Sequence, residues 1–464
     1  MLAIKLQELA EAVDGRLVDA DPTASVSAPL AIDSRAVEPG GLFAALRGER
    51  TDGHEYATAA VAAGAAAVLA ARPVDGVPCV VVDDVTEAMG RLGQHLVERL
   101  DATVVGITGS AGKTSTKDFT FQLLRASGAT IATEGSRNNE LGLPMTISLA
   151  TARTRFLVLE MGARGIGHIA YLTSIARPNI AAVTNVGTAH AGEFGGRAAT
   201  AQAKGELVES LNETGTAVLN RDDEYVAGMA SRCSGSVLWF GRDARADVTA
   251  STVRLDEHGR ARFRLHTPQG SAPVQLSLYG EHQVANALAA AGIAHAAGME
   301  AEAIAAGLTA ARALSPGRME LHERADGVTI INDAFNANPD SVRAALDTVA
   351  AMRSTTGRRA IAVLGEMAEL GEENEAGHQD VGRMAGRAGL GILVTVGGHD
   401  AALIADAARA ENPDLTVWQV PDRKVAEDFL TERLRPGDIV VVKASHAIEL
   451  HILAERLIAG DAAT

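Results

Sequence analysis

The chain has 464 residues, a formal net charge of −16 at pH 7, and 47% hydrophobic but only 3% aromatic residues. This length suits about three domains, each with its own core, and the scarcity of aromatic rings means that Ala, Val, Leu and Ile must build those cores, as in buried parallel sheets. The negative charge, with no compensating Lys/Arg cluster, excludes nucleic acid as a partner. Cys79 and Cys233 are far apart in the chain, which excludes a disulfide framework and a cysteine zinc site.

The N-terminal region predicts a small α/β module. Residues 1–15 follow an amphipathic helical pattern that differs from a signal peptide. The longest apolar run, 57–71, is shorter than the ~20 residues that span a bilayer, and we expect a helix that runs into a strand. Short β-like runs at 42–48 and 77–84 complete the module. We therefore expect a first domain at residues 1–100 and a cytoplasmic protein without membrane insertion.

A glycine-rich turn follows the apolar run 103–108 and precedes a helical pattern. The backbone N–H groups of such a turn converge on a phosphate, while Lys113 can reach the outer phosphates and Thr114 can hold magnesium. The spacing is a compressed G-x-x-G-K-T, because Ile107 stands where the general P-loop pattern has glycine. The turn predicts an ATP or GTP site formed by Gly109, Ser110, Ala111, Gly112, Lys113, Thr114 and Ser115.

Apolar strands alternate with helical patterns from about residue 103, which predicts a doubly wound, mostly parallel sheet with its ligands at the carboxyl ends of the strands. Glu160 ends one such strand and His190 follows another, so both would reach the edge where a nucleotide-bound magnesium lies. A glutamate or histidine in such a place is also typical of the solvated surface. Lys204, judged by spacing alone, is a surface lysine, because magnesium repels an ammonium. Only conversion to an anion, such as carbamylation by carbon dioxide, would make it a ligand.

A second series of strands and helices begins after the turn Ser315-Pro316-Gly317. This turn predicts a domain boundary, with a central domain at residues 101–314 and a C-terminal domain at 315–464. Arg318 follows the turn directly, where an arginine can move onto a phosphate.

The loop 332–341, NDAFNANPDS, holds Asp333 and Asn336 after a strand. Together they offer donors and acceptors for a ribose or a base. Ordinary turn chemistry explains this run and the preceding SPGRME equally well.

Taken together, these segments resemble the Mur ligase family, whose members form amide bonds in the cytoplasmic steps of peptidoglycan assembly. The resemblance covers essentially the whole chain and rests on the strand that ends at Glu160 and on the ordered runs TGSAGKTSTK, TNVGTAH, AQAKGEL, GEHQVANALAA, SPGRME, NDAFNANPDS and VVKAS. It implies an N-terminal domain for the UDP-sugar end of the substrate, a central P-loop ATPase domain, and a C-terminal Rossmann-like domain. The last would bind the incoming amine and part of the ATP.

The resemblance also implies roles for single residues. Glu160 and His190 would hold magnesium together with a carbamylated Lys204, beside Thr114 at the first of two Mg²⁺ ions. The implied ATP contacts outside the turn are Asn286, Arg318, Asp333 and Asn336, and the implied substrate contacts are Ser34, Arg35, Asn138, Asn139, Lys443 and Ser445.

Within the family, the runs NNELGLP, NDAFNANPDS and LGEMAELGEENEAGH are similar to the branch that joins D-alanyl-D-alanine to UDP-N-acetylmuramoyl-tripeptide through an acyl phosphate. The D-N-P-R signature typical of the branch that adds the third residue is not found in the sequence. The run VVKASHAIEL departs from the K-G-S-R of the dipeptide-adding branch at Ala444 and His446. No role of that arginine therefore carries over. We expect a monomer with small-molecule substrates.

Other functions remain as alternatives. They are the sister ligase that adds the third residue, a folylpolyglutamate-type synthetase, and a nucleotide-gated binding protein without catalysis. The last would have no need of Glu160, His190 and Lys204.

Overall fold

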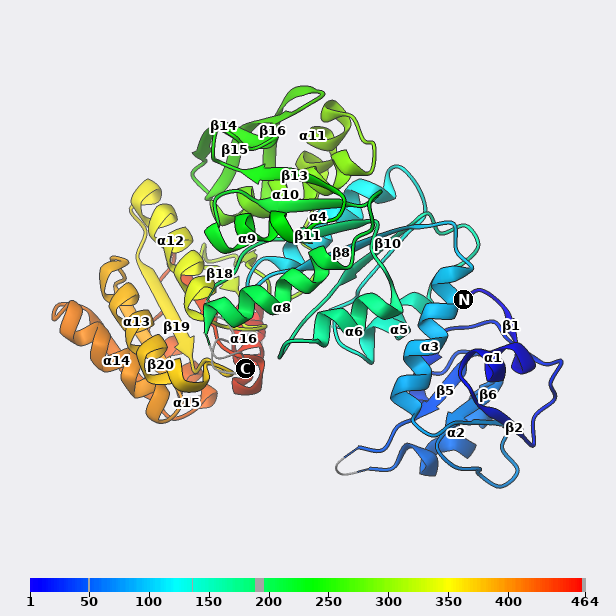
Figure 1. Cartoon of the computed structure of the whole chain (residues 1–464). Helices are drawn as coiled ribbons and strands as arrows, with labels where there is room; N and C mark the ends of the chain where they lie inside the picture. The colour runs from blue at the N-terminus through cyan, green and yellow to red at the C-terminus, as the bar shows by residue number, and fades with distance from the viewer. Residues whose placement is uncertain (49–50, 136, 188–195, 461–464) are drawn as a thin grey trace.

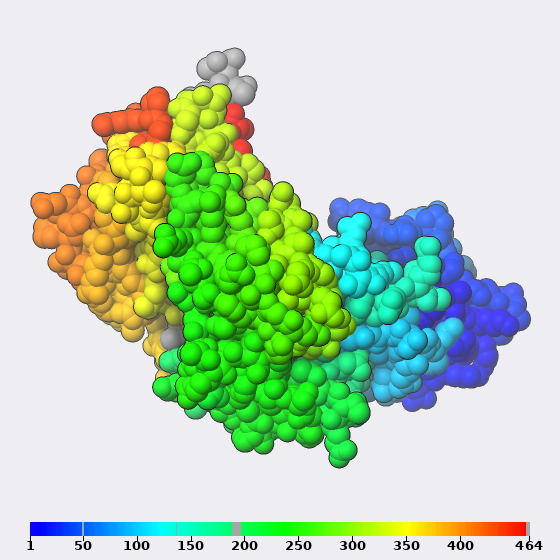
Figure 2. All heavy atoms as spheres, turned by 90° about the horizontal axis from the view of Figure 1, so that it is seen from above, coloured from blue at the N-terminus to red at the C-terminus, as the bar shows by residue number. Residues whose placement is uncertain are grey.

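The computed structural model describes residues 1–48, 51–135, 137–187 and 196–460. It confirms the predicted α/β class with three domains, and the central domain lies between the other two (Figure 1). The view from above in Figure 2 shows the same order, with the N-terminal and C-terminal domains on either side of the central one. Within the described residues, no helix combines the length and the apolar character needed to cross a membrane.

The N-terminal domain is built on a sheet with the strand order β2-β7-β6-β5-β4. Among the described strands of this sheet, only β2 runs antiparallel to its neighbour. Strands β1 and β3 form a separate antiparallel pair. The expected helix that runs into a strand at 57–71 is confirmed as α2 and β6. The elements are β1 (Ile4–Lys5), α1 (Leu6–Ala12), β2 (Arg16–Val18), β3 (Ser25–Val26), β4 (Leu30–Ala31), η1 (Ser34–Ala36), β5 (Leu42–Ala45), η2 (Gly53–Tyr56), α2 (Ala57–Ala62), β6 (Ala67–Ala70), β7 (Cys79–Val81) and α3 (Val85–Glu98).

The central sheet has the order β16-β15-β14-β13-β12-β11-β8-β10-β9 and is parallel from β9 to β14. Strands β10 and β11 are buried along their whole length, as continuous apolar runs predict. The antiparallel extension β14-β15-β16 was not expected from the sequence. The elements are β8 (Thr103–Thr108), α4 (Lys113–Arg125), β9 (Thr130–Ala132), α5 (Gly142–Ser148), β10 (Phe156–Glu160), α6 (His168–Ile175), β11 (Ile180–Val183), α8 (Arg197–Glu209), β12 (Thr216–Asn220), α9 (Glu224–Gly228), η3 (Met229–Arg232), β13 (Ser236–Gly241), β14 (Val248–Leu255), β15 (Arg260–Thr267), β16 (Gly270–Tyr279), α10 (His282–Ala296) and α11 (Ala301–Ala310).

The C-terminal sheet has the order β17-β18-β22-β19-β20-β21 and is parallel except for β17 at its edge. Apolar clusters cover both of its faces, so this domain has a core of its own. The elements are β17 (Glu320–Glu323), β18 (Thr329–Asn332), α12 (Pro339–Thr356), β19 (Ala360–Gly365), η4 (Gly371–Glu373), α13 (Asn374–Arg387), β20 (Ile392–Val396), α14 (His399–Glu411), β21 (Thr416–Val420), α15 (Arg423–Arg433), β22 (Ile439–Lys443), η5 (His446–Ile448) and α16 (Leu450–Ala459).

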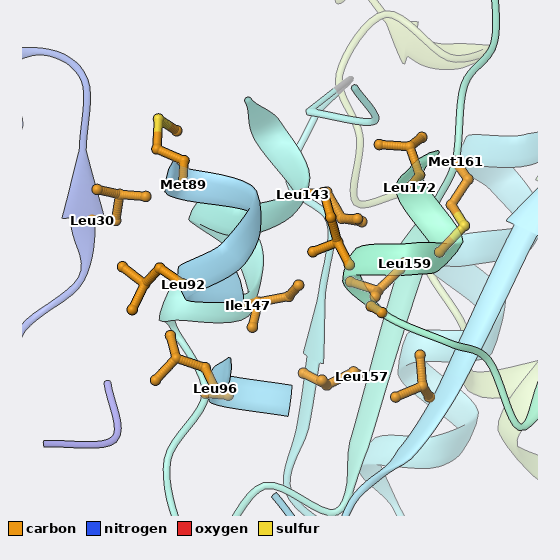
Figure 3. Packing of buried hydrophobic residues seen from close by; sticks show 14 of the residues in the cluster. Leu30, Met89, Leu92, Leu96, Leu143, Ile147, Leu157, Leu159, Met161 and Leu172 are labelled. Carbon is orange, nitrogen blue, oxygen red and sulfur yellow. The ribbon is translucent and has the colours of Figure 1, made fainter. Parts of the chain in front are cut away.

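The N-terminal and central domains share one continuous apolar core, so the expectation of a separate core for each domain is wrong at this junction. Helix α3 lies between the two sheets (Figure 3). Its Met89, Leu92 and Leu96 belong to the same buried cluster as Leu30 of the N-terminal sheet and Ile147 of α5. Burial of one such side chain contributes about 1.5–3 kcal/mol, so α3 holds the two domains together strongly.

The carboxyl ends of β8, β10 and β11 lie side by side, because β8 pairs with both of its neighbours in parallel. The glycine-rich turn, Glu160 and the residues after Val183 therefore emerge at one edge of the central sheet. Ligands of doubly wound sheets bind at such an edge.

Candidate active site

The glycine-rich turn occupies residues 109–112 between β8 and α4, and its two glycines are required by its shape. Gly109 and Gly112 have φ angles of 152° and 77°, which side chains disfavour. A Cβ on Gly112 would lie 2.2 Å from Asn286 Oδ1, and one on Gly109 would lie 1.8 Å from Thr184 Oγ1. The turn is therefore built for glycine, as a backbone that approaches a phosphate closely must be.

The segment after β11 fixes the turn from the side. Asn185 Oδ1 accepts from the N–H of Ala111 at 2.8 Å, and Asn185 Nδ2 donates to the Ala111 carbonyl at 3.0 Å. Thr184 Oγ1 donates to the same carbonyl at 2.7 Å. Thr184 and Asn185 belong to the run TNVGTAH, in which His190 alone was predicted to be a site residue. His190 itself lies outside the described residues.

Lys113 begins helix α4, and its side chain reaches back to the turn. Its Nζ donates to the carbonyl oxygen of Gly109 at 2.7 Å. Burial lowers the pKa of Lys113, and the nearby negative charge of Glu160 opposes that shift. A buried ammonium at the mouth of this turn attracts an anion strongly, because little water screens it.

Glu160, at the end of β10, is 1% exposed, and its carboxylate is held by two side chains. Thr114 Oγ1 donates to Oε2 at 3.0 Å, and Asn138 Nδ2 donates to Oε1 at 2.8 Å. A hydroxyl and a carboxylate next to a phosphate-binding turn are the oxygen donors that Mg²⁺ takes in nucleotide sites, where phosphates and waters supply its other ligands. The described residues contain no cluster of three or more His, Cys, Asp or Glu side chains that would hold a metal without such a ligand.

Lys204, on α8, is 2% exposed, so the alternative of a surface lysine is wrong. Burial, together with repulsion from Lys113, lowers the pKa of Lys204 to about 7. Helix α8 is fixed close to this lysine by Glu206. Glu206 accepts from the N–H groups of Gly167 and Ala170 at the start of α6, at 2.6 and 2.9 Å.

On the C-terminal side of the site, aromatic rings support Arg318. Its guanidinium lies 4.3 Å from the centre of the Phe335 ring. The Phe335 ring contacts His446, which stacks on His451 with 4.7 Å between ring centres. Burial lowers the pKa of Arg318. His446, which stands where an arginine was expected from the resemblance, thus belongs to a row of rings that leads through Phe335 to Arg318.

Asp333 and Lys443 form a buried ion pair with 2.6 Å between Oδ2 and Nζ. Lys443 Nζ also donates to the Asn336 carbonyl at 2.9 Å, and Asp333 Oδ1 accepts from the N–H of Met319 at 3.1 Å. These contacts fix the loop after β18 relative to Arg318. They occupy side-chain groups that were predicted to contact ligands, so in this structure Asp333 and Lys443 shape the loop.

The central and C-terminal domains enclose a cleft of about 700 Å³, and the two sets of side chains meet there. Most of the residues expected at the site line it: Ser110, Ala111, Gly112, Lys113, Thr114, Ser115, Asn138, Asn139, Glu160, Lys204, Arg318, Asn336 and Ser445. Gly109, Asn286 and Lys443 lie behind this wall, in contact with residues that line it, and Asp333 pairs with Lys443 there.

Ser34 and Arg35 do not lie in this cleft. They form η1 on the N-terminal domain, where the Arg35 side chain is 88% exposed and pairs with Asp33 at 2.7 Å. A ligand that contacts them and the cleft must extend across the surface of the N-terminal domain.

Family models match the chain in three segments. The model described as "Mur ligase family, catalytic domain" matches residues 29–95, "Mur ligase middle domain" matches 107–294, and "Mur ligase, glutamate ligase domain" matches 317–446.

Individual relatives match over nearly the full length. The UDP-N-acetylmuramoyl-tripeptide–D-alanyl-D-alanine ligase of Mycobacterium tuberculosis is 45% identical over 99% of this chain and 99% of its own. The ligase of that name from Escherichia coli is 39% identical over 87% of this chain and 88% of its own. Among solved structures, MurF from Acinetobacter baumannii superimposes with a TM-score of 0.87 at 33% identity, covering 98% of this chain and 99% of that one. A MurF ligase from Thermotoga maritima in complex with ADP gives 0.81 at 27% identity, covering 93% and 97%.

Proposed function

The chain belongs to the Mur ligase family, and we propose that it joins D-alanyl-D-alanine to UDP-N-acetylmuramoyl-tripeptide at the expense of ATP. It is an ATP-dependent ligase of peptidoglycan synthesis, and its products are the UDP-linked pentapeptide, ADP and phosphate. One observation carries the assignment of the site. The phosphate-binding turn with Lys113 and the support for Arg318 belong to different domains, yet both line one cleft that also contains Glu160.

The electrostatics of the first step explain this arrangement. The carboxylate at the end of the tripeptide must approach the γ-phosphate of ATP, and both are anions. Two unit charges 4 Å apart repel by about 4 kcal/mol at an effective dielectric constant of 20. Lys113 and Arg318 supply opposite charge from the two walls of the cleft. When bound, Mg²⁺ adds Lewis-acid neutralisation of the phosphate oxygens, and Thr114 and Glu160 would hold it.

The product of this step is an acyl phosphate, which water would hydrolyse. The amine of the dipeptide must therefore reach the activated carbonyl in a cleft from which water is excluded. Closure of the C-terminal domain on the central domain meets this need, and the split of the cleft residues between the two domains supports it. On this basis we propose domains at residues 1–100, 101–314 and 315–464.

Lys204 supports a further part of the proposal, a carbamate at its Nζ. Only a neutral amine reacts with carbon dioxide, and a pKa of about 7 leaves about half of the Lys204 amines neutral at pH 7. The carbamate would turn a cation buried near Lys113 into an anion able to hold a second Mg²⁺. His190 is a proposed ligand of the same ion.

The remaining contacts follow from the substrates. We propose Ser34 and Arg35 for the uridine diphosphate end, Asn138, Asn139 and Ser445 for the peptide part, and Asn286 and Asn336 for the nucleoside of ATP. Because one chain supplies both walls of the cleft, we propose a monomer. Because it would use ATP and a UDP-linked precursor, we propose that it acts in the cytoplasm.

The test of this function is the dependence of ADP release on both co-substrates. Purified enzyme should release ADP only with UDP-N-acetylmuramoyl-tripeptide and D-alanyl-D-alanine present together. A panel with meso-diaminopimelate and L-lysine as residue three identifies the preferred tripeptide. ADP release that needs no dipeptide would refute the ligase, and release with glutamate or diaminopimelate as the amine would favour a sister ligase.

A further inference from the structure

The second half of the proposed reaction needs an amine that has lost a proton. An α-amino group has a pKa of about 8, so at pH 7 roughly nine-tenths of a dipeptide carries an ammonium, which has no lone pair for attack. A carboxylate beside the bound ammonium would both attract it and accept its proton. None of the residues assigned so far does this.

Glu369 supplies such a carboxylate on the C-terminal wall. It lies in the loop between β19 and η4, and its exposed side chain lines the cleft. Burial lowers the pKa of Lys113, and the negative charges of Glu160 and Glu369 both oppose that shift, so Glu369 is within electrostatic reach of the phosphate-binding turn.

The other carboxylates that line the cleft in the described part of the chain are less suited to an amine. Glu160 is 1% exposed and its carboxylate is proposed to hold Mg²⁺, so it does not serve the amine. Glu140 lines the cleft on the side of the N-terminal domain. There, burial raises the pKa of Tyr171, and the negative charge of Glu140 adds to that shift.

The backbone of Glu369 is held in an unfavourable conformation. Its φ of 67° is in the left-handed region, which costs a residue with a side chain about 1–2 kcal/mol. The two residues before it are fixed by hydrogen bonds. The N–H of Met367 donates to Nε2 of the buried His378 at 2.9 Å, and the N–H of Ala368 donates to Ser445 Oγ at 2.8 Å. Glycine would relieve the conformation, so the presence of a glutamate points to a use for its carboxylate.

The cleft that Glu369 lines carries charges of both signs. The charged and titratable groups that line this part of the cleft are Lys113 on α4, Glu160 on β10, Lys204 on α8, Arg318 after the interdomain turn and His446 on η5. On the wall formed by the α5 and α6 region they are Glu140, Arg164, His168 and Tyr171. The cations suit the carboxylate and phosphate of the first step, and Glu369 has the charge that suits an ammonium.

We propose that Glu369 is a catalytic residue that receives the amino group of the incoming dipeptide and removes its proton, an inference that rests on the proposed ligase function. The proton passes from the ammonium nitrogen to a Glu369 oxygen. The freed lone pair forms the C–N bond, the bond between the carbonyl carbon and the phosphate oxygen breaks, and phosphate leaves with that electron pair. The second proton on the new amide nitrogen leaves with the phosphate, and Glu369 returns its proton to solvent.

The test compares Glu369→Gln and Glu369→Gly with the control Glu372→Gln. Glu372 is exposed, lies in η4 three residues away, and does not line the cleft. In both Glu369 variants, kcat/KM for D-alanyl-D-alanine should fall roughly 10²-fold at pH 7, with KM for ATP within twofold of the wild type. The defect should shrink as the pH rises towards 9.5, where the dipeptide is already neutral.

Hydroxylamine provides a second readout, because it is neutral at pH 7 and traps an acyl phosphate as a hydroxamate. Hydroxamate formation by Glu369→Gln should match the wild type. A pH-independent defect, an equal loss with hydroxylamine, or full activity of Glu369→Gly would overturn the proposal. If the wild type itself releases no ADP in response to the dipeptide, the proposed function fails instead, so the two failures are distinguishable.

Discussion

Substitution of Gly112 by alanine tests the phosphate-binding turn most directly. The left-handed conformation of Gly112, with φ of 77°, adds about 1–2 kcal/mol for any L side chain. The new methyl group would also lie 2.2 Å from Asn286 Oδ1, so Asn286 must move. That movement breaks the hydrogen bond from Asn286 Nδ2 to Gln283, 3.0 Å long and buried, at about 1 kcal/mol. We expect a total destabilisation of about 2–3 kcal/mol.

Nucleotide binding should suffer more than stability. If two N–H groups of the turn no longer point at a phosphate, each lost charge-assisted hydrogen bond removes about 1.5–3 kcal/mol, and ADP affinity falls by at least roughly 10²-fold. Isothermal titration with ADP and urea unfolding measure the two effects. Gly357→Ala is the matched control, since Gly357 has φ of 69° and no atom within 4 Å of the added carbon. Gly357→Ala should therefore lose only the roughly 1–2 kcal/mol of unfolding free energy that the left-handed backbone costs. A Gly112→Ala variant that binds ADP normally would refute the assignment of the turn.

Three further predictions follow from buried charges. Lys113→Met should lower kcat roughly 10²–10³-fold without lowering the thermal midpoint, and retained turnover in an ADP-release assay would remove this lysine from the mechanism. The pKa of Lys204 is about 7 in the folded chain against a normal 10.5, so between these values the unfolded chain binds the extra proton and stability rises with pH. In CO₂-free buffer, Lys204→Met should therefore show about 2 kcal/mol less gain in unfolding free energy than the wild type from pH 7.5 to 9, and an identical gain would contradict this. Asp118→Asn leaves the ammonium of Lys117, 2.5 Å away and buried, without its carboxylate and should cost roughly 3–5 kcal/mol in urea unfolding, whereas a loss below 1 kcal/mol would show that this pair is dispensable.

The sequence predicts the fold well where the residue pattern of a single strand or helix is enough to indicate its structure. Continuous apolar runs such as 156–160 and 180–183 are typical of buried strands, and their alternation with helical patterns predicts a parallel sheet. The antiparallel extension was missed, although β15 alternates buried and exposed residues and thus carried a readable signal. The shared core at α3 was also missed, because the sequence does not reveal which face of a helix meets another domain.

The candidate site was predictable where a motif combines with a strand end, as at Lys113, Thr114 and Glu160. It was not predictable where the contact joins distant segments. The support of the turn by Asn185 spans more than 70 residues, and the pairing of Asp333 with Lys443 spans 110. Glu369 lies in the run LGEMAELGEENEAGH, which indicated the branch but no role for this residue, because its left-handed backbone and its place on the cleft wall appear only in the folded chain.

The continuous core beneath α3 determines how this protein can be divided. A fragment that begins at residue 101 would expose the apolar surfaces of α5 and α6 that α3 covers, including Ile147 and Ile175. Such a fragment would aggregate, whereas the C-terminal domain carries a complete core and is the natural unit to excise or exchange. A chimaera that grafts the C-terminal domain of another ligase should therefore be joined at the turn near residue 315, with residues 1–314 kept as one unit.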